Sequence, residues 1–112
     1  AAFDLGIAEK SLKDGVAKWA TVQAYYSMFH TAKALVLSKG YREKSHFCLR
    51  AALKNLFVDN NLLEASFLDD YDTAKDLREN ADYESDFSAE GARRLIEKAK
   101  KFLNKVKDIL SS

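Results

Sequence analysis

The sequence contains a single cysteine, Cys48, only four glycines and no proline. One cysteine excludes an intramolecular disulfide and a cysteine-rich zinc site. Without proline, and with few glycines and no low-complexity segment, no linker is visible along the chain. We therefore expect the 112 residues to form one domain, residues 1–112.

Long apolar runs are also missing. No stretch approaches the roughly 18 apolar residues of a membrane span, and the N-terminal residues lack the basic-then-apolar layout of a signal peptide. We expect a protein without a membrane partner, located in the cytoplasm, where a reducing environment suits an unpaired cysteine.

The common motifs of phosphate loops and nucleophilic enzymes are absent, since there is no glycine-rich loop and no Gly-x-Ser-x-Gly elbow. Glu43 and His46 do have the Glu-x-x-His spacing of di-iron bundles. Such sites need a second copy of this motif and two further inward glutamates, but residues 17–39 contain no acid. We therefore expect no metal and no cofactor.

Apolar residues recur at helical spacing through most of the chain, with no sustained alternation typical of strands. The sequence thus predicts an all-α fold, an up-and-down helical bundle of about five helices with a four-helix-bundle-like core. The predicted helices are one ending at Asp14-Gly15, a long one over roughly 17–39, one capped by Ser45, one with Asn61 and Glu64 as a capping box, and one opened by Ser88.

The helix over 17–39 is apolar on two faces, so it is predicted to be central, with a partner subunit as one possible cover. Charge is distributed unevenly as well: residues 59–90 carry eleven acids against two bases, a net charge of −9, and the remainder carries +10. Such segregation indicates either self-association of unlike surfaces or a basic face for an anionic partner. Solvated helix faces are the plainer explanation for most of these charges.

Arg78 stands among acids in the stretch DLRENADYE. On a helix it shares a face with Tyr71, so its stem can lie on apolar surface while its guanidinium reaches the edge. Spacing alone leaves two interpretations open, a surface ion pair with Asp82 or the cation of a phosphate site. His30 shares a face with Tyr26, and a lone histidine there is more often a hydrogen-bonded core residue than a ligand.

Four pieces in this order, AYYSMFHTAKALVLSKGY, SHFCLRAALKNLF, LRENADYE and SAEGARRLIEKAKKFL, resemble the HEPN family (higher eukaryotes and prokaryotes nucleotide-binding) over nearly the whole chain. The resemblance implies a helical bundle that pairs as a homodimer. It also implies a toxin-antitoxin context, in which many prokaryotic members act as ribonuclease toxins beside a minimal nucleotidyltransferase. Other members bind nucleotides without cutting RNA.

In the ribonuclease members the signature is an arginine followed, after four to six residues, by a histidine. The arginine matches Arg78, but Tyr83 stands where the shortest spacing would place the histidine. Histidine titrates near about 6.5 and suits proton transfer at neutral pH, whereas tyrosine titrates near about 10. The resemblance therefore implies a catalytic pair that lacks its histidine.

We group Arg78, Asp82, Tyr83, Tyr71 and His30 as the candidate contacts of an anion, a nucleotide or a second subunit. Three functions remain open. The first is binding of a nucleotide or of a minimal nucleotidyltransferase, with Arg78 as phosphate ligand. The second is a metal-independent ribonuclease that uses Arg78 and Tyr83, and the third is a structural helical adaptor without a ligand.

Overall fold

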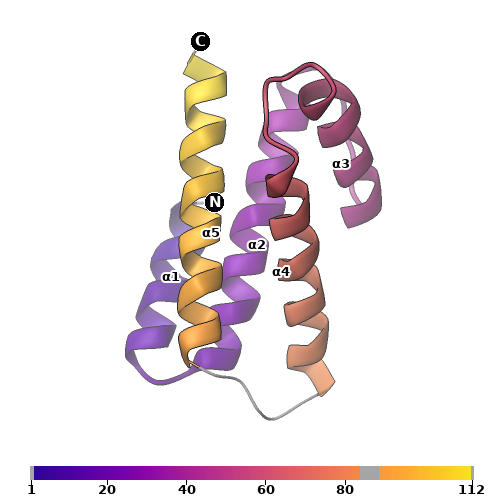
Figure 1. Cartoon of the computed structure of the whole chain (residues 1–112). Coiled ribbons are helices and arrows are strands. Elements are labelled where there is room, and N and C mark those ends of the chain that lie inside the picture. Colours follow the sequence, from indigo (N-terminus) through magenta and orange to yellow (C-terminus); the bar gives the residue numbers. More distant parts are fainter. Residues whose placement is uncertain (1, 84–88, 112) are drawn as a thin grey trace.

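The computed structural model describes residues 2–83 and 89–111, with the side chains of residues 2 and 80–83 outside that description. Within these ranges the chain is a bundle of α-helices without strands, so the predicted all-α class is confirmed (Figure 1). The helices are α1 (Ala2–Lys13), α2 (Ala17–Leu37), α3 (His46–Leu53), α4 (Ser66–Tyr83) and α5 (Ala89–Ser111), and a π-helical turn η1 (Lys54–Val58) continues α3.

Helix α2 is the centre of the bundle, as predicted. It packs against α1 and α5 on one side and against α4 and α3 on the other (Figure 1). Its small side chains Ala20, Ala24 and Ala32 are fully buried and allow close helix approach. Both apolar faces are therefore largely covered within the chain, without a partner subunit.

Glycine ends α2 where the sequence predicts a stop. Gly40 has φ +86°, a left-handed conformation that favours glycine, and its amide donates to the Leu37 carbonyl at 2.8 Å. The amide of Tyr41 donates to the Val36 carbonyl at 3.4 Å and completes the C-terminal cap of the helix. The chain then reverses direction, so residues 41–44 lie beside the C-terminal half of α2.

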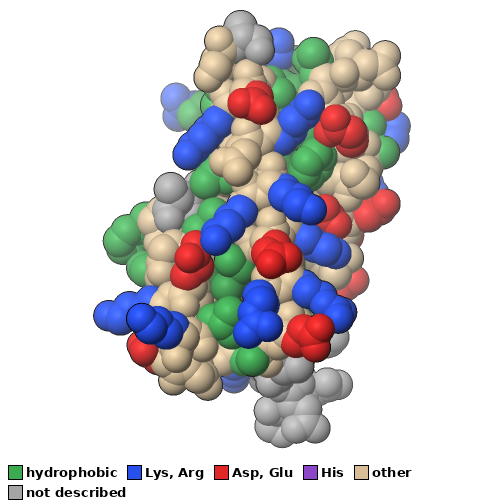
Figure 2. Space-filling model, turned by 60° about the vertical axis from the view of Figure 1, so that its left-hand side comes forward, with side chains coloured by type: hydrophobic (Ala, Val, Ile, Leu, Met, Phe, Trp, Pro, Cys, Tyr) green, Lys and Arg blue, Asp and Glu red, His purple; other side chains and the backbone are tan. Residues whose placement is uncertain are grey.

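Helix α5 buries one apolar face and exposes a basic one. Its buried residues are Ala92, Leu95, Ile96, Ala99, Phe102 and Val106. On the exposed face Lys98 pairs with Asp70 at 3.4 Å, Lys100 with Glu9 at 3.1 Å, and Lys105 with Glu64 at 3.3 Å. Lys and Arg side chains accordingly alternate with Asp and Glu on this side of the molecule (Figure 2). Two of these pairs join basic α5 to the acidic segment 59–90, so folding itself neutralises part of the charge segregation.

The predicted start of the fourth helix is wrong. Asn61 has φ +60°, whereas an N-cap residue normally adopts an extended backbone. A turn closes here instead, because the Leu62 amide donates to the Phe57 carbonyl at 2.8 Å. Glu64 directs its carboxylate to Lys105 rather than back to Asn61, and α4 begins at Ser66. The predicted opening of the last helix at Ser88 lies outside the described residues.

No helix among the described residues is both long and apolar enough to cross a bilayer.

Candidate functional site

Arg78 is half-buried on α4 and lies against Tyr26 of α2. Its Nη2 donates to the Tyr26 hydroxyl at 3.3 Å, and its guanidinium carbon lies 5.8 Å from the centre of the Tyr26 ring. Tyr71 and Ala74, on the same side of α4, are fully buried. The arginine stem therefore follows the apolar face of α4, as the sequence predicts, and the tyrosine helps to hold the charged head at the edge of the core.

His30 lies one turn after Tyr26 on the same side of α2. The Tyr26 side chain is 37% exposed, and its ring stacks on His30 with centroids 6.3 Å apart and an interplanar angle of 26°. His30 is exposed, so its interpretation as a core histidine is wrong. The reason is that residues 26, 30 and 33 follow the one strip of α2 that neighbouring helices leave uncovered.

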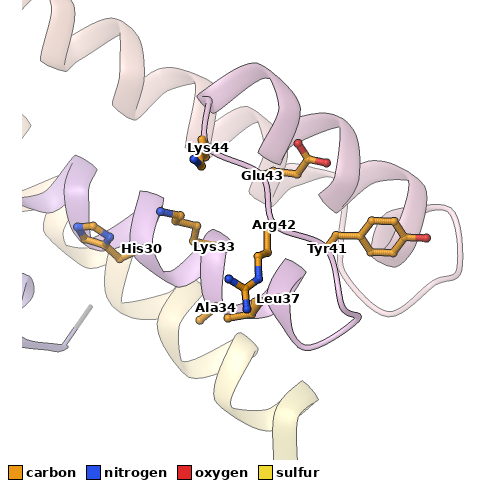
Figure 3. A pocket seen from close by; sticks show the side chains of 8 residues that line it. All are labelled: His30, Lys33, Ala34, Leu37, Tyr41, Arg42, Glu43 and Lys44. Carbon is orange, nitrogen blue, oxygen red and sulfur yellow. The ribbon is translucent and has the colours of Figure 1, made fainter.

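A pocket of about 460 Å³ opens at the far end of this strip (Figure 3). Its lining combines the C-terminal half of α2 with the segment that follows Gly40, and consists of His30, Lys33, Ala34, Leu37, Tyr41, Arg42, Glu43 and Lys44. Only His30 of this set was predicted as a candidate ligand contact. The cations Lys33, Arg42 and Lys44 are brought together by the reversal of the chain after α2, which periodicity within one helix does not reveal.

Tyr71 does not share this surface. Its side chain is fully buried, and its ring stacks on the rings of His46, with centroids 3.9 Å apart, and Tyr25, with centroids 6.3 Å apart. Burial raises the pKa of Tyr71, with Tyr25 and Asp72 adding to the effect. A neutral, enclosed phenol is a core residue, so Tyr71 is not an anion contact in this conformation.

His46 lies at the centre of a second polar group that the sequence did not indicate. Its Nε2 lies 3.1 Å from Asp72 Oδ1, and its Nδ1 lies 3.4 Å from the Tyr25 hydroxyl. Arg50 Nε donates to the other oxygen of Asp72 at 2.7 Å. If Nε2 carries the proton and donates to the carboxylate, Nδ1 accepts from Tyr25. We call Tyr25, His46, Arg50 and Asp72 the α3 clamp, because they fasten α3 to α2 and α4.

Burial and hydrogen bonding set the protonation of the clamp. Burial lowers the pKa of His46, and the bond to Asp72 opposes this without reversing it. Burial alone would raise the pKa of Asp72, but the bonds from His46 and Arg50 hold it below its ordinary value. The predicted cap at Ser45 is also present, since Ser45 Oγ accepts from the Cys48 amide at 3.1 Å. His46 is thus more than the first residue of a helix.

The remaining candidates lie near the end of α4. The side chains of Asp82 and Tyr83 lie outside the described residues, so an Arg78–Asp82 pair stays a prediction. Glu79 forms an ion pair with Lys75 at 3.5 Å. Within the described part of the chain, no three His, Cys, Asp or Glu side chains come together as metal ligands.

The guanidinium of Arg78, at the edge of the core, can bind an anion. Guanidinium groups form paired hydrogen bonds to phosphate oxygens, and an adjoining aromatic face can stack on a base. Arg78, Tyr26 and His30 provide these elements in one row, which we call the α2 row.

Comparison with known proteins places the chain in a family. The model of the HEPN domain matches residues 1–109. A Methanocaldococcus jannaschii protein named "Putative toxin MJ0142" is 33% identical over 96 residues, which cover 84% of this chain and 65% of that protein. A second protein of the same organism, "Putative toxin MJ0605", is 33% identical over 92 residues, covering 81% of this chain and 69% of that protein. The chain thus spans about two thirds of the length of these relatives, and it belongs to the HEPN domain family.

Proposed function

We propose that this HEPN protein binds the phosphate of a nucleotide or RNA at Arg78, as a member of a toxin-antitoxin-like pair with a minimal nucleotidyltransferase. The observation that carries the proposal is the contact of the half-buried Arg78 guanidinium with Tyr26. A guanidinium held on an aromatic face is less hydrated than a free one and is pre-oriented for a planar or tetrahedral anion.

Relatives named as putative toxins support the toxin-antitoxin part of the proposal. The nucleotidyltransferase partner is proposed because many prokaryotic members of the HEPN family are encoded beside one. Binding rather than RNA cleavage is proposed because position 83 is a tyrosine. A phenol with a pKa near about 10 is a poor proton shuttle at neutral pH. The acids of segment 59–90 oppose close docking of an RNA backbone along the length of α4, so the proposed contact on this helix is that of a single phosphate with Arg78.

A homodimer is part of the proposal. The uncovered strip of α2 exposes two large aromatic side chains, Trp19 at 57% and Tyr26 at 37%. Trp19 and Tyr26 are seven residues apart, about two helical turns, and therefore project from the same side of α2. A second copy packed over Trp19 would bring the boundary of the dimer close to Arg78.

The test compares wild type with Arg78→Ala in binding a fluorescent single-stranded RNA and in cleaving RNA in the presence of EDTA. Loss of a charged hydrogen bond to phosphate should weaken binding by roughly 10- to 100-fold. Arg94→Ala is the matched control, because Arg94 pairs with Glu90 on exposed α5 and should leave affinity unchanged.

Two results would contradict the proposal. Equal affinity in wild type and Arg78→Ala would favour the adaptor function, in which Arg78 is only structural. EDTA-resistant cleavage that disappears in both Arg78→Ala and Tyr83→Phe would establish the ribonuclease alternative.

A further inference from the structure

The pocket at the end of α2 gathers three cations, Lys33, Arg42 and Lys44. Across residues 2–83 and 89–111 none of the three is in an ion pair. Many other cations of the chain have carboxylate partners, namely Arg50, Lys54, Lys75, Arg94, Lys98, Lys100 and Lys105. The one carboxylate that lines the pocket belongs to Glu43, which points away from the Arg42 guanidinium (Figure 3). The pocket thus holds a local excess of positive charge.

The shape of the pocket suits a phosphate ester. Its volume of about 460 Å³ lies within the range of small-ligand sites. Ala34 and Leu37 give it an apolar wall on α2, and the Arg42 side chain extends from the loop toward them (Figure 3). Cationic heads beside an apolar wall match the two halves of a nucleotide, an anionic phosphate and a flat base.

His30 connects the pocket with the α2 row, because it lines the former and stacks on Tyr26 in the latter. Tyr26 and Lys33 are separated along the axis of α2 by about 10 Å, at a rise of about 1.5 Å per residue. A single phosphate group cannot contact Arg78 and the pocket together. An oligonucleotide can contact both, with its bases on the exposed rings of Tyr26 and His30 that lie between Arg78 and the pocket.

We propose that this pocket is a second phosphate subsite for a single-stranded oligonucleotide, whose adjoining nucleotides lie on His30 and Tyr26 and extend to Arg78. The inference rests on the proposed function, since it extends the Arg78 site along α2. Alternating cations and exposed aromatic faces are what single-stranded nucleic acids bind. An acidic peptide would satisfy the same cations but would gain nothing from the two stacked rings.

The experiment measures the affinity of a labelled single-stranded RNA of about ten nucleotides, a typical site size, as salt is varied. The variant is Arg42→Gln/Lys44→Gln, and the control with the same charge change is Lys98→Gln/Lys100→Gln on α5. We expect the pocket variant to bind about tenfold more weakly or worse. The slope of log affinity against log salt should also fall by about 1.4, or about 0.7 for each lost contact. The control should resemble wild type, and thermal denaturation checks that both variants are folded.

The outcomes separate the two proposals. Wild-type affinity and slope in the pocket variant, together with weak binding by Arg78→Ala, would overturn the subsite and leave the proposed function intact. Equal weakening for adenosine monophosphate and for the RNA would make the pocket a mononucleotide site, and displacement of the RNA by polyglutamate at equal charge would make it a peptide site. Either result overturns the oligonucleotide path. Absence of binding of both the RNA and adenosine monophosphate by wild type would overturn the proposed function itself.

Discussion

Replacing Asp72 with Asn tests whether the α3 clamp holds α3 in place. The carboxylate accepts from both His46 and Arg50, whereas an amide offers one oxygen and turns an N–H toward the other donor. The His46 side chain is 10% exposed and that of Asp72 39%, so the lost bond should cost as much as a charged hydrogen bond that solvent partly screens. Arg50 is 36% exposed, and water will replace much of what it loses. Together these give a loss of about 1 to 3 kcal/mol in the free energy of unfolding.

Urea denaturation followed by circular dichroism measures this loss, with Asp59→Asn as the control. Asp59 pairs with Lys54 in solvent, and its replacement should change the free energy of unfolding by less than about 1 kcal/mol. An Asp72→Asn protein as stable as the control variant would show that the clamp is an incidental surface contact.

Four further predictions concern pH, the core, the dimer and the motif. Because the pKa of His46 is lowered in the folded state, the unfolded chain binds the proton more tightly. The contribution of His46 to the free energy of unfolding should therefore be complete above about pH 6.5 and fall as pH drops below that value. His46→Gln should flatten this part of the stability profile in urea titrations at different pH values. Phe102→Ala should lose roughly 3 to 5 kcal/mol, because the ring is fully buried and lies 5.7 Å from that of Phe67, and an unchanged melting transition would contradict this. Trp19→Glu should convert dimer to monomer in sedimentation at micromolar concentration, and a wild type that is only monomeric there would contradict the predicted dimer. Tyr83→His should create EDTA-resistant RNA cleavage if only the imidazole is missing, and continued inactivity would show that more than this residue has changed.

Periodicity was sufficient to predict the long helices. In α5 the apolar residues recur every three or four positions, and Ala92, Leu95 and Phe102 are all buried as the pattern requires. In α2 the apolar character on two faces correctly predicted a central position. It also suggested a subunit as cover, although the neighbouring helices of the same chain provide most of it. A sequence pattern shows that a face needs covering but not which chain covers it.

The segment from α3 to α4 was not predictable in the same way. The capping-box interpretation of Asn61 and Glu64 relied on residue types alone. A π-helical turn over Lys54–Val58 precedes this segment, and Asn61 adopts a left-handed conformation. The carboxylate of Glu64 forms an ion pair with Lys105 on α5. The left-handed backbone of Asn61 and the bond from the Leu62 amide to the Phe57 carbonyl therefore exclude the N-cap conformation, and residue types alone do not show this.

The candidate site shows the same division between local and distant information. The apolar face beneath Arg78 was visible in the spacing of α4, but its partner Tyr26 is 52 positions away. The bonds of His46 were not predictable from its neighbours in sequence, which are ordinary for a helix start, because its partners come from α2 and α4. His30 thus differs from its sequence-based interpretation as a core residue, and the enclosure of His46 was not predicted. His30 faces solvent beside a cationic pocket, where it is accessible to a ligand, and His46 is enclosed in a clamp whose carboxylate and phenol already satisfy both ring nitrogens. Of the two imidazoles, His30 is therefore the one that a bound nucleotide can reach without opening the bundle.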